Sequence, residues 1–366
     1  MNRKPSNKKY ISVYRTVLCI IAAMSISLCF ILNAGNFFEP ENLRAVSIGN
    51  KGIYIPIKPN GKEKSLPKND GLYNDEIFMI REKEEPKDNT SEEPAKYTGA
   101  YPIVSLDMSN KAGLGEVLIN DTDSGITIDV EYFKELRYPE SLRTKDVTKL
   151  SSSSEPLVLI VHTHATECYS PEGAVGYDDS TSFRSTDTDK NMIAVGKVLT
   201  DTLTLNNIPT IQCQTLHDAA DYNASYQNSL ESVKAYLKEY PSIKYVFDLH
   251  RDAIIRENGE LIKPQYIRDE ESCAQVMTLV GTNALGADHP NWQDNMNLAV
   301  KLQIKLTETY NGIARPINTR GASFNQQYAP GSLLFEIGSC ANSLSEAKRA
   351  AVYLGEAISQ TIRENS

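Results

Sequence analysis

The segments LVLIVHTHATE (residues 157–167) and IKYVFDLHRD (residues 243–252) each contain an apolar run that leads into histidine. An apolar, β-branched run of this length between polar residues predicts a strand that is buried on both faces of an α/β sheet. The prediction places His162, His164 and His250 at the carboxyl ends of strands. Open α/β sheets carry their binding and catalytic sites at that edge.

Strands and helices are expected to alternate through the rest of the C-terminal part. Apolar residues at helical spacing predict helices at 188–206, 222–237, 294–310 and 344–362, and short apolar runs predict strands at 208–213, 276–280 and 333–337. Alternation of this kind favours parallel pairing. We therefore expect a three-layer α/β domain with a mainly parallel sheet over residues 155–366.

The amino-terminal segment has the pattern of a membrane anchor. Its first sixteen residues carry five basic side chains and no acidic one, and residues 17–38 carry no charge. An uncharged run of this length spans a bilayer core, and the basic flank favours a cytoplasmic amino terminus. Residues 1–38 are therefore expected to form a cytoplasmic tail and a single-pass transmembrane helix, with the rest of the chain outside the cytoplasm. Small residues at 33–35 leave a cleaved signal peptide as the alternative.

Two segments connect this anchor to the α/β domain. Residues 39–99 are rich in Lys, Glu, Asp, Pro and Asn, a composition that buries little apolar surface and predicts a disordered linker. Within residues 100–154, alternating runs at 115–122 and 125–130 flank a polar turn. They predict a small β hairpin or edge element that packs on the main domain. A Ser-rich joint at 151–154 follows it.

Charge and cysteine content exclude some functions. The net charge of −9 argues against nucleic acid as a partner. Two of the six cysteines fall inside the uncharged amino-terminal run, and the other four are widely spaced with no CxxC pair. The pattern indicates neither a disulfide framework nor a structural zinc cluster.

The histidines are the strongest chemical signal. Only five occur in the chain, and three of them end predicted strands. Residues two apart on a strand face the same side, so His162 and His164 are expected to point together into one cleft. Two imidazoles, a carboxylate and an open position for water form a catalytic zinc site. The alternative, for any histidine taken singly, is a buried residue that hydrogen-bonds to its neighbours.

Five sequence blocks in order resemble the stage II sporulation protein P family. They are HTHATE (162–167), RSTDTDKNMIAVG (184–196), HDAADYNASYQNS (217–229), DLHRDAI (248–254) and FEIGSCANS (335–343). The resemblance covers roughly residues 103–366 and is weak before residue 157. It implies a fold similar to that of the zinc-dependent N-acetylmuramoyl-L-alanine amidases. It also implies amidase and peptide-bond cleavage of peptidoglycan during forespore engulfment in endospore-forming bacteria.

The resemblance also implies roles for single residues. In those amidases a histidine follows the first strand, an acid opens the next helix, a second histidine ends a later strand and a glutamate ends the last strand. Carried over, this makes His164 and His250 metal ligands, with Asp187 as the acidic ligand and Asp189 or Glu167 as alternatives to Asp187.

Glu336, in FEIG, takes the place of the catalytic glutamate. Bound Zn²⁺ would lower the pKa of water and polarise the amide carbonyl, while a carboxylate moves the proton to the leaving amine. The alternative is a buried glutamate paired with Arg251 or Arg320.

Other residues around the motif are expected to support ligands or substrate. His162 and Glu167 would orient a ligand or contact substrate, and Arg184 and Arg251 would hold a stem-peptide carboxylate or serve as ordinary ion-pair partners. Two functions therefore compete. The leading one is a membrane-anchored zinc hydrolase of peptidoglycan that works with a membrane-bound lytic transglycosylase of the engulfment complex. The other is a non-catalytic module of the same fold that binds the wall and recruits another hydrolase.

Overall fold

The central feature of the fold is a seven-stranded sheet. The computed structural model describes residues 100–143 and 155–365. In those residues the strand order is β2 (Ile119–Asp121), β10 (Ile317–Arg320), β9 (Val276–Gly281), β11 (Gly331–Ser339), β6 (Tyr245–Asp252), β3 (Val158–Val161) and β5 (Thr210–Gln212). Every neighbouring pair of this sheet is parallel except β9 with β11. The predicted mainly parallel sheet is confirmed.

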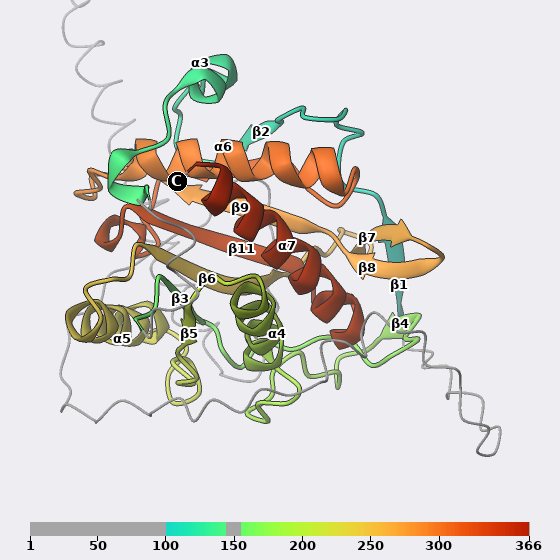
Figure 1. Cartoon of the computed structure of the whole chain (residues 1–366). Helices are drawn as coiled ribbons and strands as arrows, with labels where there is room; N and C mark the ends of the chain where they lie inside the picture. The colour runs from blue at the N-terminus through green and yellow to red at the C-terminus, as the bar shows by residue number, and fades with distance from the viewer. Residues whose placement is uncertain (1–99, 144–154, 366) are drawn as a thin grey trace, which may run out of the picture. The chain divides into compact units, whose positions relative to one another are not determined.

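Helices cover both faces of the sheet (Figure 1). On one face Val158 and Ile160 of β3 share a core with α4 (Met192–Leu205), α6 (Trp292–Thr309) and α7 (Leu344–Glu364). On the other face Leu159 and Val161 pack with α5 (Ser225–Glu239). Successive side chains of a strand point to opposite faces, so an unbroken apolar strand is what a sheet between two helical layers requires.

The helix starts are encoded locally. The side chain of Asn191 accepts the backbone N–H of Ile193 and begins α4. At α7 the hydroxyl of Ser343 accepts from Glu346 N, and the Glu346 carboxylate accepts from Ser343 N. This reciprocal pair is a capping box, and it satisfies backbone donors that a helix terminus leaves free.

A second, four-stranded sheet was not expected from the sequence. Its order is β4 (Gly176–Tyr177), β1 (Tyr101–Leu106), β7 (Leu261–Arg268) and β8 (Glu271–Ala274). Asp269 and Glu270 connect β7 to β8 with φ of 52° and 67°. Tight hairpins with this backbone usually contain Asn or Gly, and here the turn signal is absent from the sequence.

Of the two forms expected within residues 100–154, the described residues contain the edge element and not the hairpin. β2 pairs in parallel with β10 at the edge of the seven-stranded sheet, and the chain after it forms α3 (Val130–Glu135) and the short helix η1 (Glu140–Leu142). The Asp121 carboxylate explains why the chain after β2 does not fold back as a second strand. It accepts hydrogen bonds from Ser124 N at 3.0 Å and Gly125 N at 2.9 Å. These bonds close a local turn that leads away from β2.

The expected tail and transmembrane anchor (1–38), the linker (39–99) and the Ser-rich joint (151–154) lie outside the described residues. Among the helices of residues 100–143 and 155–365, none is long and apolar enough to cross a membrane.

Candidate functional site

Two strands at the centre of the sheet bring an acid and a histidine together. Glu336 of β11 lies directly beside His250 of β6 in the parallel register. Neighbours in register project to the same face, so both side chains point to the same side of the sheet. His250 is buried, whereas Glu336 as a whole residue is half-buried.

His164 comes from the turn that follows β3. Backbone N–H of Glu167 donates to the carbonyl of His164 at 3.1 Å and closes this turn. The imidazole of His164 lies edge-on to that of His250, with ring centroids 5.2 Å apart, and stacks on Tyr222 at 4.5 Å. Tyr226 lies edge-on to His164 at 5.6 Å. The structure therefore brings His164 and His250 together, with the rings of Tyr222 and Tyr226 packed against His164.

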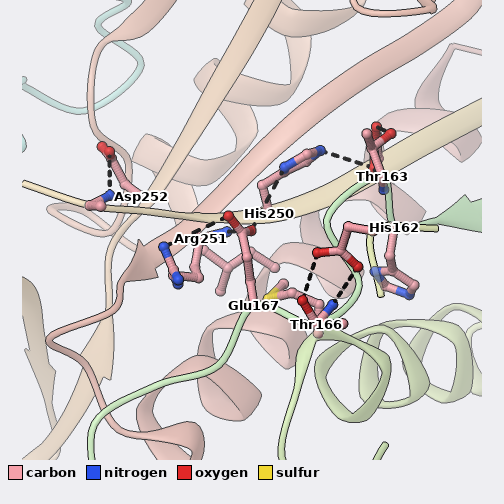
Figure 2. Close-up of polar contacts among 12 residues, drawn as sticks. His162, Thr163, Thr166, Glu167, His250, Arg251 and Asp252 are labelled. Carbon is pink, nitrogen blue, oxygen red and sulfur yellow. Dashed lines mark hydrogen bonds and ion pairs between the residues drawn. The ribbon is translucent and has the colours of Figure 1, made fainter. Parts of the chain in front are cut away.

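Glu167 joins this cluster. Its Oε2 lies 3.8 Å from His250 Nδ1 and accepts the backbone N–H of Arg251 at 3.2 Å (Figure 2). The Arg251 guanidinium lies 3.7 Å from the other carboxylate oxygen and donates to the carbonyls of Cys168 and Phe183. Because Arg251 is buried and its guanidinium is occupied by these groups, it holds the turn in place and is not placed to bind substrate.

Burial and nearby charge shift the acid–base properties of the cluster. Burial and the neighbouring Asp252 raise the pKa of Glu336 to about 8, despite the opposing effect of His250. Burial alone would lower the pKa of His250, but Asp248 and Glu167 outweigh it and raise that pKa to about 9. Burial and the proximity of His250 hold the pKa of His164 well below its usual value. Groups with displaced pKa values in one place are typical of functional sites.

The two arginines considered as ion-pair partners of Glu336 both pair with other acidic residues. Arg251 pairs with Glu167, and Arg320 pairs with Asp123 at 3.2 Å. Among the described residues, Oε2 of Glu336 is buried without a hydrogen-bond partner. A buried carboxylate oxygen without a partner is costly in a plain structural role, which favours a functional one.

The expectation that His162 points together with His164 is wrong. His162 follows Val158 and Ile160 on the face covered by α4, and its Nε2 lies 3.0 Å from Gln212 Nε2. In Figure 2 its ring turns toward α4 and away from His250. Side chains two residues apart share a face only within a strand. Because β3 ends at Val161 and the chain turns before His164, this rule does not apply to His162 and His164. Burial lowers the pKa of His162 to about 3, so this imidazole is a neutral part of the core.

The structure does not bring Asp187 to the histidines. Its side chain is 43% exposed, and its carboxylate pairs with Lys190 at 2.8 Å. The hydrogen bond from Lys190 holds the pKa of Asp187 below its usual value. Asp189 is exposed as well. Of the three acids predicted from the sequence, Glu167 alone contacts His250.

Arg184 occupies the rim of the cluster. Its Nη1 donates to Asp218 at 2.8 Å and to the hydroxyl of Thr166 at 3.0 Å, and the guanidinium lies 4.3 Å from the ring centroid of Tyr222. Its side chain is 40% exposed, so part of the cation faces solvent next to the Tyr222 ring that stacks on His164. Arg184 is therefore placed to meet an anionic group on a bound molecule.

Sequence reasoning assigned no role to Asp218, Tyr222, Tyr226 or Asp248. The first three lie in the block HDAADYNASYQNS, whose aromatic and acidic residues were the available signal. Asp248 stands two residues before His250 on the same strand, so the spacing alone places it on the same face. Its Oδ1 lies 3.1 Å from His250 Nε2.

The donor chemistry of the cluster fits zinc. Two histidines and a glutamate are one of the common ligand sets of catalytic zinc. Nδ1 of His164 is buried without a hydrogen-bond partner among the described residues. His250 Nδ1 and Glu167 Oε2 are 3.8 Å apart, close to the ~3.4 Å that separates two donors of one tetrahedral zinc. Within residues 100–143 and 155–365, no three His, Cys, Asp or Glu side chains already stand in a metal-binding arrangement. The ligands would have to draw closer to share an ion.

Fold and site together define an α/β protein with a buried histidine–glutamate cluster at the carboxyl edge of a mainly parallel sheet. The chain belongs to the stage II sporulation protein P family, whose model matches residues 57–359.

Among curated proteins, a relative is the stage II sporulation protein P of Bacillus subtilis (strain 168), 27% identical over 221 residues. The match covers 57% of this chain and 51% of the relative, so the chain spans about half the length of that protein.

Several solved structures are similar at low identity. The CwlD amidase from Clostridioides difficile, solved in complex with the GerS lipoprotein, has a TM-score of 0.37 and 14% identity, over 57% of this chain and 97% of that one. An N-acetylmuramoyl-L-alanine amidase from Clostridium difficile 630 has a TM-score of 0.36 and 16% identity, over 58% and 97%. The amidase AmiC2 of Nostoc punctiforme has a TM-score of 0.35 and 11% identity, over 57% and 96%.

Proposed function

We propose that the protein is a zinc-dependent peptidoglycan hydrolase that acts as an N-acetylmuramoyl-L-alanine amidase on the cell wall during forespore engulfment. The observation that carries the proposal is the convergence of His164, Glu167, His250 and Glu336 at one edge of the sheet in a member of this family. Cleavage of a peptide crosslink by the same site is the second form of the activity, since it is also hydrolysis of an amide bond.

His164, Glu167 and His250 are the proposed protein ligands. Glu167 replaces Asp187 in this set, because Glu167 is buried against His250 while Asp187 is paired with Lys190 at the surface. A bound Zn²⁺ supplies Lewis acidity toward the amide carbonyl and toward water. The three residues would leave a fourth position open, as catalytic zinc sites do.

Glu336 is the proposed general base and acid. It is half-buried, its Oε2 has no hydrogen-bond partner among the described residues, and burial has raised its pKa. A carboxyl group with a raised pKa holds a proton more readily than an ordinary glutamate, which suits a group that takes up a proton and returns it. It would accept the proton of a water molecule as the water oxygen bonds to the amide carbon. When the C–N bond breaks, the same carboxyl group would return the proton to the leaving nitrogen, giving a carboxylic acid and an amine.

Arg184 is the proposed contact for the stem peptide. Its half-exposed guanidinium lies on Tyr222 next to His164, and a stem peptide carries free carboxylates. Charge-assisted bonds between guanidinium and carboxylate are strong and directional. Arg251 has no such role in this proposal, because Glu167 and two carbonyls occupy it.

The proposed location of the protein rests on the sequence of its amino-terminal part. We propose that residues 1–38 hold the chain in the cell membrane as a single pass, that residues 39–99 form a linker and that the domain from residue 155 lies outside the cytoplasm. A membrane-bound lytic transglycosylase that cuts the glycan strand is the proposed partner. The competing function, a wall-binding module without catalysis, shares the fold and the location.

The test uses the purified full-length protein in detergent. Elemental analysis should find one zinc per chain, and incubation with purified sacculi should release new amino termini on L-alanine. A chelator should abolish this release, and added zinc should restore it. One zinc per chain with intact sacculi would favour the wall-binding module, and activity that survives complete metal removal would refute the zinc mechanism.

A further inference from the structure

Asp248 makes a buried contact with the proposed ligand His250. Its Oδ1 lies 3.1 Å from Nε2 of the imidazole, within reach of a hydrogen bond once the ring turns into line, because Nε2 as it stands has no hydrogen-bond partner among the described residues. The other ring nitrogen, Nδ1, faces Glu167 at 3.8 Å. Asp248 is buried on β6, two residues before His250 and on the same face of the strand. The two ring nitrogens therefore face two different carboxylates.

The Asp248 carboxylate is itself held rigidly. Thr163 donates to it twice, from its backbone N at 2.9 Å and from its hydroxyl at 2.5 Å. The hydroxyl of Thr163 also lies 2.8 Å from Ser229 Oγ, which accepts from Asn325 Nδ2 at 3.2 Å. The carboxylate is thus connected to the turn after β3, to α5 and to the loop before the short helix η3 (Gln326–Tyr328).

We propose that Asp248 is a positioning residue that accepts the Nε2–H of His250 and so directs its Nδ1 lone pair toward the centre shared with Glu167 and His164. A histidine ligand whose other N–H is bound by a carboxylate has a fixed tautomer and ring plane and is a better donor. The inference deepens the proposed function and rests on it. It adds a residue for which neither the sequence motifs nor the family resemblance supplied a role.

A second threonine–aspartate pair in the same protein provides a matched control. Thr166 donates to Asp218 from its backbone N at 3.0 Å and from its hydroxyl at 2.7 Å. Asp218 is buried like Asp248, but its charged partner is Arg184 rather than a histidine. If the role of Asp248 were only to stabilise the turn after β3, changes at the two pairs would have the same effect on metal binding.

The experiment compares zinc affinity in full-length protein by competition with a chromophoric chelator, alongside the midpoint of thermal unfolding. Asp248→Asn keeps the size of the side chain and removes its charge, and it should weaken zinc binding by roughly 10–100-fold. Asp218→Asn should leave zinc affinity within about twofold of the parent, whatever its effect on stability. At saturating zinc, Asp248→Asn should regain much of its cleavage activity.

If Asp248→Asn fails to fold, the zinc affinities of Thr163→Val and Thr166→Val test the same role of Asp248. Thr163→Val removes one donor from the carboxylate and should weaken zinc binding several-fold, whereas Thr166→Val should not. Equal zinc affinity in Asp248→Asn and parent, or equal losses at the two threonines, would overturn the positioning role while leaving the proposed function intact. Absence of zinc from the parent would instead refute the proposed function, and the positioning role with it.

Discussion

Exchange of single carboxylates for amides at Glu167 and Asp187 identifies the acidic metal ligand. We expect Glu167→Gln to lose zinc and Asp187→Asn to keep it, because only Glu167 is buried against His250. Loss of one of three protein ligands should weaken zinc binding by more than the ~100-fold that is the upper range for loss of an outer partner.

The structure also sets the stability cost of Glu167→Gln. The change leaves the buried Arg251 without its carboxylate, and breaking a buried ion pair from one side costs about 3–5 kcal/mol. Arg251 keeps its bonds to the carbonyls of Cys168 and Phe183, so we expect the lower end, about 3 kcal/mol. For a domain of this size that corresponds to a fall of roughly 6–12 °C in the unfolding midpoint. Asp187→Asn alters an exposed ion pair and should leave the midpoint nearly unchanged.

The assay is zinc content after dialysis, measured together with circular dichroism during heating and with release of amino groups from sacculi. Full zinc content in Glu167→Gln and none in Asp187→Asn would refute the assignment and restore the prediction made from the sequence. Loss of zinc from both variants would mean that the loop around Asp187 moves to the histidines when metal binds.

Three further predictions concern the core, pH and substrate. Gly196→Ala would place a Cβ 2.4 Å from the His162 ring and 2.5 Å from Gln212 Nε2. It should therefore lower the free energy of unfolding, measured in urea, by about 1–3 kcal/mol. An unchanged free energy of unfolding would contradict this packing. Burial lowers the pKa of His289 from 6.5 to about 4, so the unfolded chain binds a proton there first and stability should fall as pH drops from 6.5 to 4. His289→Leu should flatten that part of the curve, and an identical slope in parent and variant would refute the burial argument. Arg184→Gln should raise KM at least ~10-fold for a stem peptide with a free carboxylate but not for its amidated form, whereas an equal effect on both would exclude the contact.

Much of the architecture could be predicted from the sequence because its signals are local. The apolar runs before His162 and His250 specify buried parallel strands, and the helical spacing of 188–206 and 344–362 specifies helices that cover them. Parallel strands end at one edge, so the approach of His164, His250 and Glu336 follows from their positions at strand ends.

The remaining features depend on the tertiary structure and on turns that composition does not reveal. The end of β3 at Val161 sends His162 and His164 in different directions, although their spacing suits a common face. The β7–β8 turn uses Asp269 and Glu270 with positive φ, where no Asn or Gly marks it. The acidic ligand could not be chosen from spacing, because Asp187 and Glu167 differ in burial, which the order of residues does not determine.

The most direct test of the central claim is the activity of zinc-loaded Glu336→Gln on sacculi, with zinc content and thermal unfolding measured on the same samples. The amide has the size of the carboxylate but cannot take up the proton of water, so cleavage should fall by ~10²–10⁴-fold. Zinc content and unfolding midpoint should match those of the parent, because Glu336 is not among the proposed ligands. Unchanged cleavage would contradict the role of Glu336 as the base, and lost cleavage together with lost zinc would make it a ligand instead.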